Sequence, residues 1–271
     1  MKLSVTTWNI NSVRLRSDQV RQFLENERPD ILCLQETKCP DDKFPFKELK
    51  SFGYPFITNV GQKGYNGVAI LSKYPFSSTQ VMSMCERMDA RHIAITLAPE
   101  AKQAAGITIH NFYVPAGGDI PDAVLNPKFA HKLQFLAEMR AWGERNRKLG
   151  APGILVGDLN IAPLEHDVWS HKKLLDVVSH TPLETETLET LRQEAGWVDG
   201  MRHLRPEPEK IYSWWSYRSP DWAAADKGRR LDHIWLTEDL APVLKSMHVT
   251  KETRGWERPS DHAPVTAILE L

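Results

Sequence analysis

The sequence has no excess of charge of one sign. Its 271 residues include 34 Lys and Arg against 35 Asp and Glu, which gives a formal net charge of −1. No overall basic field therefore attracts phosphates, so a nucleic-acid partner requires a local basic patch or a metal ion. With 41% hydrophobic residues, 25% charged residues and a mean hydropathy of −0.42, the composition also excludes a disordered, a collagen-like and a membrane-spanning chain.

Cysteine is scarce as well. Cys33, Cys39 and Cys85 show no C-x-x-C spacing and leave one thiol over in any pairing scheme. This pattern indicates reduced thiols and a cytoplasmic location. Residues 1–8 are too few and too polar for the apolar segment of a secretory signal, so we expect folded structure from residue 3 onward.

Several motifs of other enzyme classes are missing. The sequence has no G-x-x-x-x-G-K-[ST] phosphate loop, no G-x-S-x-G elbow and no H-E-x-x-H pair among its ten histidines. The Gly117-Gly118 pair lacks the strand–turn–helix context of a dinucleotide site. ATP hydrolysis and acyl transfer are therefore excluded, and a zinc site fits poorly.

The chain does contain many short runs of β-type residues, bounded by Gly, Pro, Asn or Asp. These predict strands at residues 3–8, 31–34, 67–71, 93–97, 107–114, 153–156, 211–217, 231–236, 244–250 and 265–269. Three helices are also predicted. One is capped by Ser17 and ends before Pro29, and the others span residues 127–148 and 182–195.

The mixture of helix-separated and hairpin-like strands predicts an α/β fold in which two β-sheets pack face to face. Sheet-rich enzymes of this length often fill one domain, and no interdomain linker is evident, so we expect a single domain over residues 1–271. The Pro- and Gly-rich segments 115–127, 205–210 and 218–228 are expected to be surface loops, where functional residues concentrate.

Acidic, amide and imidazole side chains follow or interrupt the apolar runs. Asn and Asp after a strand are ordinary turn formers. Glu36 is not a turn residue, however, and Asp232 lies within an apolar run, where a carboxylate must be hydrogen-bonded or paired. The whole set is hard to explain as turns: Asn9, Asn11, Glu36, Asp158, Asn160, Asp232, His233, Asp261 and His262.

Carboxylates and amides without a Cys ligand suit a hard cation, Mg²⁺ or Mn²⁺. A metal ion, Asp and His together supply what hydrolysis of a phosphate ester needs. The ion neutralises charge on phosphoryl oxygens, one group deprotonates water, and another stabilises the five-coordinate state.

Seven segments resemble the exonuclease III type of AP endonuclease, a branch of the endonuclease/exonuclease/phosphatase superfamily. They occur in the family's order over nearly the whole chain: residues 8–12, 34–38, 113–115, 157–160, 214–218, 230–232 and 259–264. Leu34-Gln35-Glu36-Thr37-Lys38 and Trp214-Trp215-Ser216-Tyr217-Arg218 point to the DNA-repair branch. The resemblance implies a DNase I-like, four-layer α/β (α+β) sandwich: two mixed β-sheets flanked by helices, with the site at one edge.

The resemblance also implies a metal site and a role for each catalytic side chain. Glu36 is expected to be the principal Mg²⁺ ligand, with Mn²⁺ as a substitute, Asn9 close by and Asp261 a second acidic ligand. The complete set expected at the metal is Asn9, Glu36, Asp158, Asn160, Asp261 and His262.

Five residues are expected to be catalytic. Tyr113 contacts the scissile phosphate, and Asn160 holds the attacking water or a phosphate oxygen. Asp158 orients or deprotonates that water. His262 binds or protonates the phosphate and is held in its charged form by Asp232, as in the acid–imidazole pairs of other hydrolases. Whether Asp158 or His262 is the base stays open.

For DNA, the resemblance implies that Trp214 and Leu231 form an apolar pocket for an extruded sugar without its base. Trp214 and Trp215 alternate on a predicted strand, so one faces the core, and we expect that to be Trp215. The expected DNA-binding residues are Asn11, Arg91, Trp214, Arg229 and Leu231. Candidates for phosphate contacts are Arg14, Arg91, Lys172, Lys173, Lys227, Arg229 and Arg230.

The chain departs from the family pattern in three places. Ala116 stands where related enzymes often have Asn or Gln, and Arg229 replaces a bulky apolar residue beside the pocket. Leu174 and Val177 stand in a segment where some members place DNA-contacting Asn. We expect catalysis to survive these changes, and the balance of AP-endonuclease, 3′-exonuclease and 3′-phosphatase activity stays open.

The expected protein is a Mg²⁺-dependent DNA repair phosphodiesterase. It acts on double-stranded DNA with abasic sites or 3′ blocks, as a monomer in the cytoplasm, associated with the nucleoid in a bacterium, with no membrane partner. One alternative is a phosphodiesterase or phosphatase of the superfamily that acts on RNA, phospholipid or inositol phosphate. A DNA-binding module without activity is disfavoured, because the net charge is −1 and such a module has no need of the full acidic set.

Overall fold

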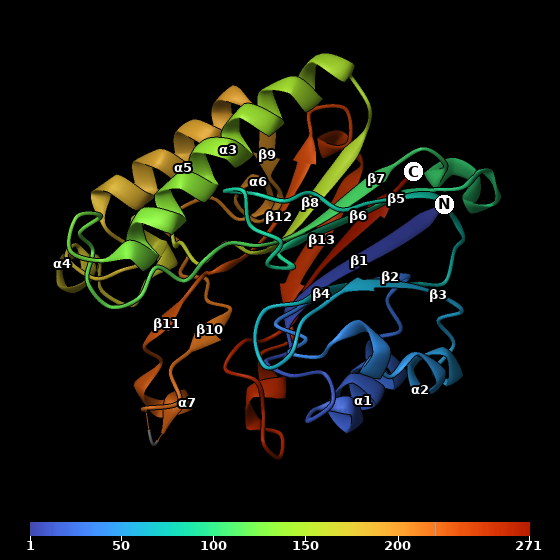
Figure 1. The fold of residues 1–271 in the computed structure, drawn as a ribbon, viewed down its shortest axis with the longest axis horizontal. Coiled ribbons are helices and arrows are strands. Elements are labelled where there is room, and N and C mark those ends of the chain that lie inside the picture. Colours follow the sequence, from blue (N-terminus) through green and yellow to red (C-terminus); the bar gives the residue numbers. More distant parts are fainter. Residues whose placement is uncertain (220) are drawn as a thin grey trace.

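The computed structural model describes residues 1–219 and 221–271. The apolar runs assemble into two six-stranded sheets (Figure 1). In the first sheet the order is β13 (Leu244–Val249), β14 (Val265–Glu270), β1 (Lys2–Asn9), β2 (Ile31–Gln35), β4 (Val68–Ser72) and β3 (Phe56–Val60). In the second it is β5 (Phe76–Gln80), β6 (His92–Leu97), β7 (Thr108–Tyr113), β8 (Gly153–Asp158), β12 (Asp232–Thr237) and β9 (Trp197–Asp199).

Helices cover the outer face of each sheet. The first sheet packs against α1 (Ser17–Glu27) and α2 (Phe46–Ser51), and the second against α3 (Pro127–Leu149) and α5 (Pro182–Glu194) (Figure 1). Helix α3 is well delimited: the Asn126 side chain accepts the amide of Lys128 at 3.0 Å, and Gly150 ends the helix with φ at +65°.

The inner faces of the two sheets share one apolar core. Ile31 and Val5 of the first sheet pack with Ile109, Val156 and others of the second. With a helical layer on each outer face, this confirms the predicted four-layer sandwich of two packed mixed sheets. None of the helices in the described part of the chain is long and apolar enough to cross a membrane.

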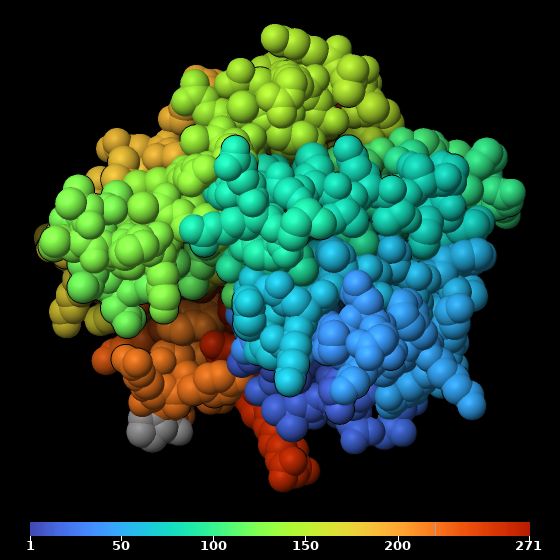
Figure 2. Space-filling model, viewed as in Figure 1, coloured from blue at the N-terminus to red at the C-terminus, as the bar shows by residue number. Residues whose placement is uncertain are grey.

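The remaining elements are short. A two-stranded arm is formed by β10 (Trp214–Trp215) and β11 (Gly228–Arg229), with α7 (Trp222–Ala225) at its tip. In Figure 2 this arm (orange) and the segment near residue 255 (red) stand at the lower edge of the molecule. The other short helices are η1 (Asp41–Lys43), η2 (Pro99–Ala104), η3 (Glu165–Asp167), α4 (His171–Leu174), α6 (Gly200–Leu204), η4 (Ala241–Val243) and η5 (Lys251–Gly255).

Most predicted strands and all three predicted helices are confirmed, and the three cysteines are free and buried. The predicted cap at Ser17 is wrong: Ser17 is the first helical residue, and the preceding Arg16 makes no side-chain cap. The strand predicted over residues 211–217 is reduced to Trp214–Trp215. The predicted loop 218–228 contains α7, and residue 220 lies outside the described residues.

The two parallel strand pairs decide where the functional residues meet. Strand β1 runs parallel to β2 and β7 parallel to β8, whereas the other strand pairs in the described residues are antiparallel. The carboxyl ends of the two strands in each parallel pair therefore lie side by side. Because β1 packs against β8 across the core, the two pairs of strand ends lie close to each other. Gly157 allows the close β7–β8 approach, because a Cβ there would lie 1.9 Å from the carbonyl oxygen of Phe112.

Candidate active site

Glu36 directly follows β2 and adopts a left-handed backbone conformation, with φ at +50°. This conformation is uncommon for a residue other than Gly and is concentrated at functional sites. The Glu36 carboxylate accepts hydrogen bonds from the Asn9 amide and the Tyr113 hydroxyl, each at 2.9 Å, and pairs with Lys38 at 2.8 Å. Burial alone would raise the pKa of Glu36, but the Lys38 ammonium and the Asn9 amide outweigh it and lower that pKa.

Asp158, the last residue of β8, is buried. The Asn9 side-chain amide that donates to Glu36 also donates to the Asp158 carboxylate, at 2.9 Å, and so links the two carboxylates. Asn160 donates to Asp158 through its backbone amide at 2.9 Å and through its side chain at 3.2 Å. Burial, opposed by the charge of His262, raises the pKa of Asp158 to about 7. Asp158 is therefore a carboxyl group able to exchange a proton near neutral pH.

His262 and Asp232 form a buried acid–imidazole pair. The Nδ1–H of His262 donates to Asp232 Oδ2 at 2.8 Å, and its Nε2 lies 3.6 Å from Asp158 Oδ2. Burial alone would lower the pKa of His262, but the Asp232 and Asp158 carboxylates raise it to about 10. The ring is thus held protonated between two carboxylates.

Asp261 belongs to the same edge but faces the arm. The segment around Trp214 pairs with the segment around His262 in an antiparallel bridge. This pairing lets the indole Nε1–H of Trp214 donate to Asp261 at 2.9 Å. The side-chain amide of Asn11 donates to the other oxygen of Asp261 at 3.2 Å. Trp215 points the other way and is 2% exposed, which confirms the predicted alternation of the two rings.

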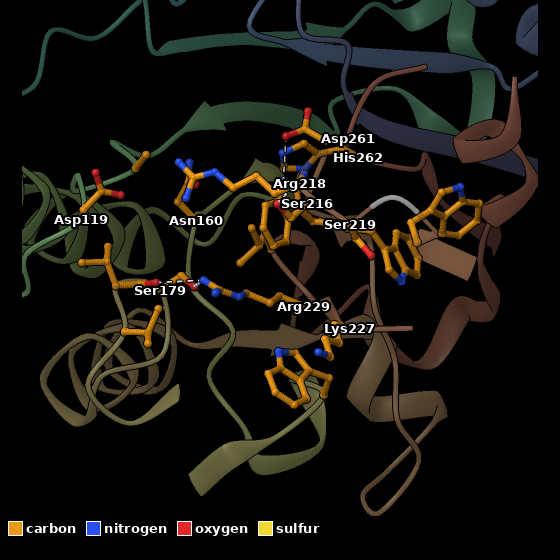
Figure 3. A pocket seen from close by; sticks show the side chains of 18 of the residues that line it. Asp119, Asn160, Ser179, Ser216, Arg218, Ser219, Lys227, Arg229, Asp261 and His262 are labelled. Carbon is orange, nitrogen blue, oxygen red and sulfur yellow. Dashed lines mark hydrogen bonds between the residues drawn. The ribbon is translucent and has the colours of Figure 1, made fainter. Parts of the chain in front are cut away.

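The side chains at this edge open onto a cavity of about 790 Å³. Figure 3 shows Asn160, Asp261 and His262 on one side of the cavity, with Arg229 stretched across it toward Ser179. Glu36 and Tyr113 also line it, and Trp214, Leu231 and Trp169 supply apolar surface. Polar, titratable groups and an aromatic surface therefore share one cavity.

The donor set fits a hard divalent cation. Glu36 and Asp261 both line the cavity, and the oxygens of Asn9 and Asn160 belong to the same group of side chains. No Cys is among them. Oxygen donors of this kind are those that Mg²⁺ and Mn²⁺ prefer. Asp158, Asp232 and His262 also place donor atoms within 4.8 Å of one another.

Residues 6–262 match the Endonuclease/Exonuclease/phosphatase family. The chain belongs to this family. It is 30% identical over 267 residues to exodeoxyribonuclease III of Haemophilus influenzae, which covers 96% of this chain and 97% of the relative.

Solved structures of this family superpose closely. A 3′ phosphatase from Neisseria bound to product DNA hairpin gives a TM-score of 0.90 at 33% identity, over 99% of this chain and 100% of that chain. An AP endonuclease from Archaeoglobus fulgidus gives 0.89 at 31% identity, with the same coverage. The family and fold expected from the sequence are therefore confirmed.

The basic residues predicted to contact DNA phosphates differ in how exposed they are. Arg14, Lys172, Lys173 and Lys227 are exposed. Arg230 is wrong as a phosphate contact: it is 1% exposed and forms ion pairs with Asp167 and Asp199. A guanidinium bonded inside the core has no access to DNA.

Arg91 and Arg229 are partly engaged inside the protein. Arg91 bonds Asp89 at 2.5 Å and lies over the Tyr113 ring at 4.8 Å. Arg229 Nη1 donates to the Val178 carbonyl at 3.0 Å, and its guanidinium lies over the Trp214 ring at 5.2 Å. The resemblance implies that Arg229, beside the pocket, binds DNA; in the structure Arg229 also lines the cavity and forms part of the pocket wall.

Two serines that sequence reasoning missed hold segments of the candidate site in place. Ser213 donates to Asp232 at 2.6 Å and accepts the backbone amide of Asp232 at 3.0 Å. Ser260 donates to the Asn9 carbonyl at 2.6 Å and accepts the amide of His262 at 3.2 Å. Ser260 lies within segment 259–264, which carries the resemblance, and Ser213 directly precedes segment 214–218. A single serine in a sequence gives no indication of such a role.

The His262–Asp232 pair makes a testable prediction about pH. Replacing Asp232 by Asn removes the charge that raises the pKa of His262, so that pKa should fall. If the protonated ring is required, activity is lost as pH rises through its pKa, and the alkaline limb of the rate profile should move to lower pH in Asp232→Asn. Rates from pH 6 to 11 with a pre-incised and an intact substrate measure this. A profile that only scales down, with its inflections in place, contradicts the coupling.

Proposed function

We propose that this chain is a metal-dependent DNA repair phosphodiesterase that incises DNA at abasic sites and removes blocks from 3′ ends. The observation that carries the proposal is the shared cavity: the acidic, amide and imidazole groups face the apolar surface of Trp214 and Leu231. The names of its relatives, an exodeoxyribonuclease III, a 3′ phosphatase and an AP endonuclease, support it. We further propose that residues 1–271 act as one domain, as a cytoplasmic monomer.

The metal is Mg²⁺, with Mn²⁺ as a substitute. Glu36 is its principal ligand, because its carboxylate is ionised, lines the cavity and is held by Asn9 and Tyr113. Asp261 is the second acidic ligand. When bound, the ion neutralises charge that develops on the phosphoryl oxygens.

Asp158 and His262 have different roles in the reaction because their protonation states differ. Asp158 takes the proton of the attacking water, since its pKa is raised to about 7 and it is therefore a matched base near neutral pH. His262 cannot serve as that base, because Asp232 and Asp158 keep its ring protonated. We therefore assign His262 to binding the phosphate and not to the metal ligands.

Asn160 and Tyr113 orient the reacting groups. The Asn160 side-chain amide is fixed by the Val114 carbonyl at 2.9 Å and by Asp158 at 3.2 Å, which leaves its carbonyl oxygen to hold the water. The Tyr113 hydroxyl donates its one proton to Glu36, and burial raises its pKa, so it stays neutral and can turn that proton to a phosphate oxygen when substrate binds.

Substrate choice follows from the cavity. An abasic nucleotide has no base to stack, so turning it out of the duplex costs less than turning out a normal nucleotide, and an apolar pocket selects it by shape. Trp214 and Leu231 supply that surface. Exposed Lys227 lines the cavity, and exposed Lys173 lies over the ring of Trp169, which also lines it; these two lysines, exposed Lys172, Asn11 and Arg91 contact the DNA backbone.

A product assay tests the proposal. Three duplexes, carrying an internal abasic site, a recessed 3′ hydroxyl or a 3′ phosphate, are incubated with the protein with and without Mg²⁺. We expect Mg²⁺-dependent incision of the first and removal of the 3′ phosphate from the third, and the rates give the balance of activities. Cleavage of RNA, phospholipid or inositol phosphate with none of the three duplexes processed would replace the proposal by another activity of the superfamily. A shift of the DNA in EDTA with no product in Mg²⁺ would indicate a binding module.

Trp214 provides a prediction about selectivity. Trp214→Ala should reduce kcat/KM for abasic incision by about tenfold or more, because the apolar contact of the indole with the extruded sugar is lost, and burial of a large apolar side chain contributes about 1.5–3 kcal/mol. Removal of a 3′ phosphate needs less of the pocket and should fall less. Trp214→Phe is the matched control: it keeps a ring and loses only the hydrogen bond to Asp261. Equal losses on both substrates in Trp214→Ala would mean that Trp214 acts by packing alone.

A further inference from the structure

A buried ion pair lies behind the active site and takes no part in the chemistry above. It joins Lys132 of α3 to Glu184 in the first turn of α5, and neither side chain has any exposed surface. Removing two charges from water is costly, and only well-placed partners compensate for that cost. The other hydrogen bonds of these two side chains therefore show what the pair holds in place.

Lys132 holds the backbone of the catalytic loops. Besides Glu184, its ammonium donates to the Asn160 carbonyl at 2.9 Å and to the Ala116 carbonyl at 3.3 Å. Asn160 adopts a left-handed conformation with φ at +53°, which Asn tolerates better than most residues, and the Lys132 hydrogen bond fixes the orientation of its carbonyl group. Asn160 and Ala116 both line the cavity, whereas Lys132 stands behind them.

Glu184 holds the pocket wall. Its two carboxylate oxygens accept the backbone amide of Ser179 at 3.0 and 2.9 Å, and one accepts the Thr181 hydroxyl at 2.7 Å. Ser179 also has a positive φ, +87°. Its hydroxyl accepts Arg229 Nη1 at 2.7 Å, and the Arg229 guanidinium covers the Trp214 ring.

One chain of contacts thus runs from Asn160 through Lys132 and Glu184 to Ser179. We propose that Lys132 and Glu184 are a pair of positioning residues that sets Asn160 for the reaction and, through Ser179 and Arg229, the wall of the substrate pocket. This inference rests on the proposed function, which assigns Asn160 to the reaction and the wall near Ser179 to substrate binding. Because the pair is hydrogen-bonded to the backbone at both ends, a displacement at the pair reaches both of them.

The test uses three variants of the full chain. Lys132→Met removes the ammonium, Glu184→Gln keeps the volume but removes the charge, and the double variant removes both charges. Leu49→Ala is the control for stability, because Leu49 is the buried residue of α2 and packs in the core on the other sheet. kcat and KM are measured for abasic incision and for 3′-phosphate removal, at a temperature well below the unfolding midpoint of each variant.

Lys132→Met should lower kcat by about tenfold or more on both substrates, since small misplacement of a catalytic group is costly. Glu184→Gln should mainly raise KM for the abasic duplex, because its amide group opposes the Ser179 amide that the carboxylate accepts. The double variant should regain part of the unfolding temperature lost in Lys132→Met, because no unpaired carboxylate remains buried. Its kcat should stay low, since the Asn160 and Ala116 carbonyls still lack their donor.

A recovery of kcat in step with stability in the double variant would overturn the proposal, as would an equal loss of kcat in Leu49→Ala. Amide NMR spectra provide a readout independent of activity. The Asn160 and Ser179 resonances should shift in Lys132→Met and in the double variant but not in Leu49→Ala, and unshifted resonances would also overturn it. If the wild-type protein processes none of the duplexes, the proposed function fails, and the spectra alone decide whether the pair positions these loops.

Discussion

Glu36→Gln is expected to lower turnover on the order of 10²–10³-fold at a fixed, moderate Mg²⁺ concentration. A metal ion that acts on phosphoryl oxygens contributes several kcal/mol of transition-state stabilisation, and tenfold in rate corresponds to about 1.4 kcal/mol. Gln keeps the volume of Glu36 and an oxygen for the Asn9 and Tyr113 donors, but it loses the charge that binds the ion. Its amide group also faces the Lys38 ammonium, which further disfavours the site.

Raised Mg²⁺ should restore part of the lost activity, because the variant binds the ion more weakly. Calorimetric titration with Mg²⁺ should show the weaker binding directly, without DNA. Glu25→Gln, an exposed position on α1, is the matched control and should behave as wild type. Thermal unfolding of both variants should be close to that of the wild-type protein. Unchanged turnover of Glu36→Gln at saturating substrate and moderate Mg²⁺ would reject Glu36 as the principal ligand.

The second large effect is expected for Asp158→Asn. General base catalysis by a placed side chain contributes about 10²–10⁴-fold, and an amide cannot take the proton of water. The Asn side chain keeps an oxygen for the backbone amide of Asn160, so the loop should remain in place. Single-turnover rates on the abasic duplex measure the loss separately from product release.

The pH profile separates loss of a base from loss of structure. A base works only when deprotonated, so the wild-type rate should rise with pH on the acid side, and burial makes this limb visible by raising the pKa of Asp158. The residual rate of Asp158→Asn should lack that limb. Duplex binding should be unchanged or tighter, because a negative charge is removed near phosphate. A variant with nearly wild-type turnover, or with the same acid limb, would return the role of base to another residue.

The fold could be predicted largely because apolar runs identify central strands. The strands missed in the two large sheets, β3, β5 and β9, are all edge strands. Residues of β5 are mostly exposed, and its sequence, Phe-Ser-Ser-Thr-Gln, has no clear alternation. An edge strand pairs with one neighbour and buries little of itself, so its existence depends on β6 more than on its own residues.

In the candidate site, too, some residues could be predicted from the sequence and others could not. Glu36 and Asp232 were recognisable because a carboxylate in or next to an apolar run needs a partner. Lys132, Glu184 and Ser179 were not, since Lys132 and Glu184 lie on helical faces that are ordinarily solvated and Ser179 is a common loop residue. Their roles come from hydrogen bonds between residues 28 and 52 positions apart, such as Lys132 to Asn160 and to Glu184. Arg230 shows the converse error: a basic residue in a functional motif proved to be buried among carboxylates.

The sequence by itself determined the family, the two-sheet architecture and the residue types of the reaction. Each of these depends on residues close together in the sequence, through apolar periodicity and short motifs. Only the tertiary structure decided which groups share protons and which hold one another. His262 is protonated because Asp232 and Asp158 lie on either side of its ring, and Arg229 forms the pocket wall because Val178 and Ser179 face it. Charge state and orientation depend on distances between segments far apart in the chain, which the order of residues does not specify.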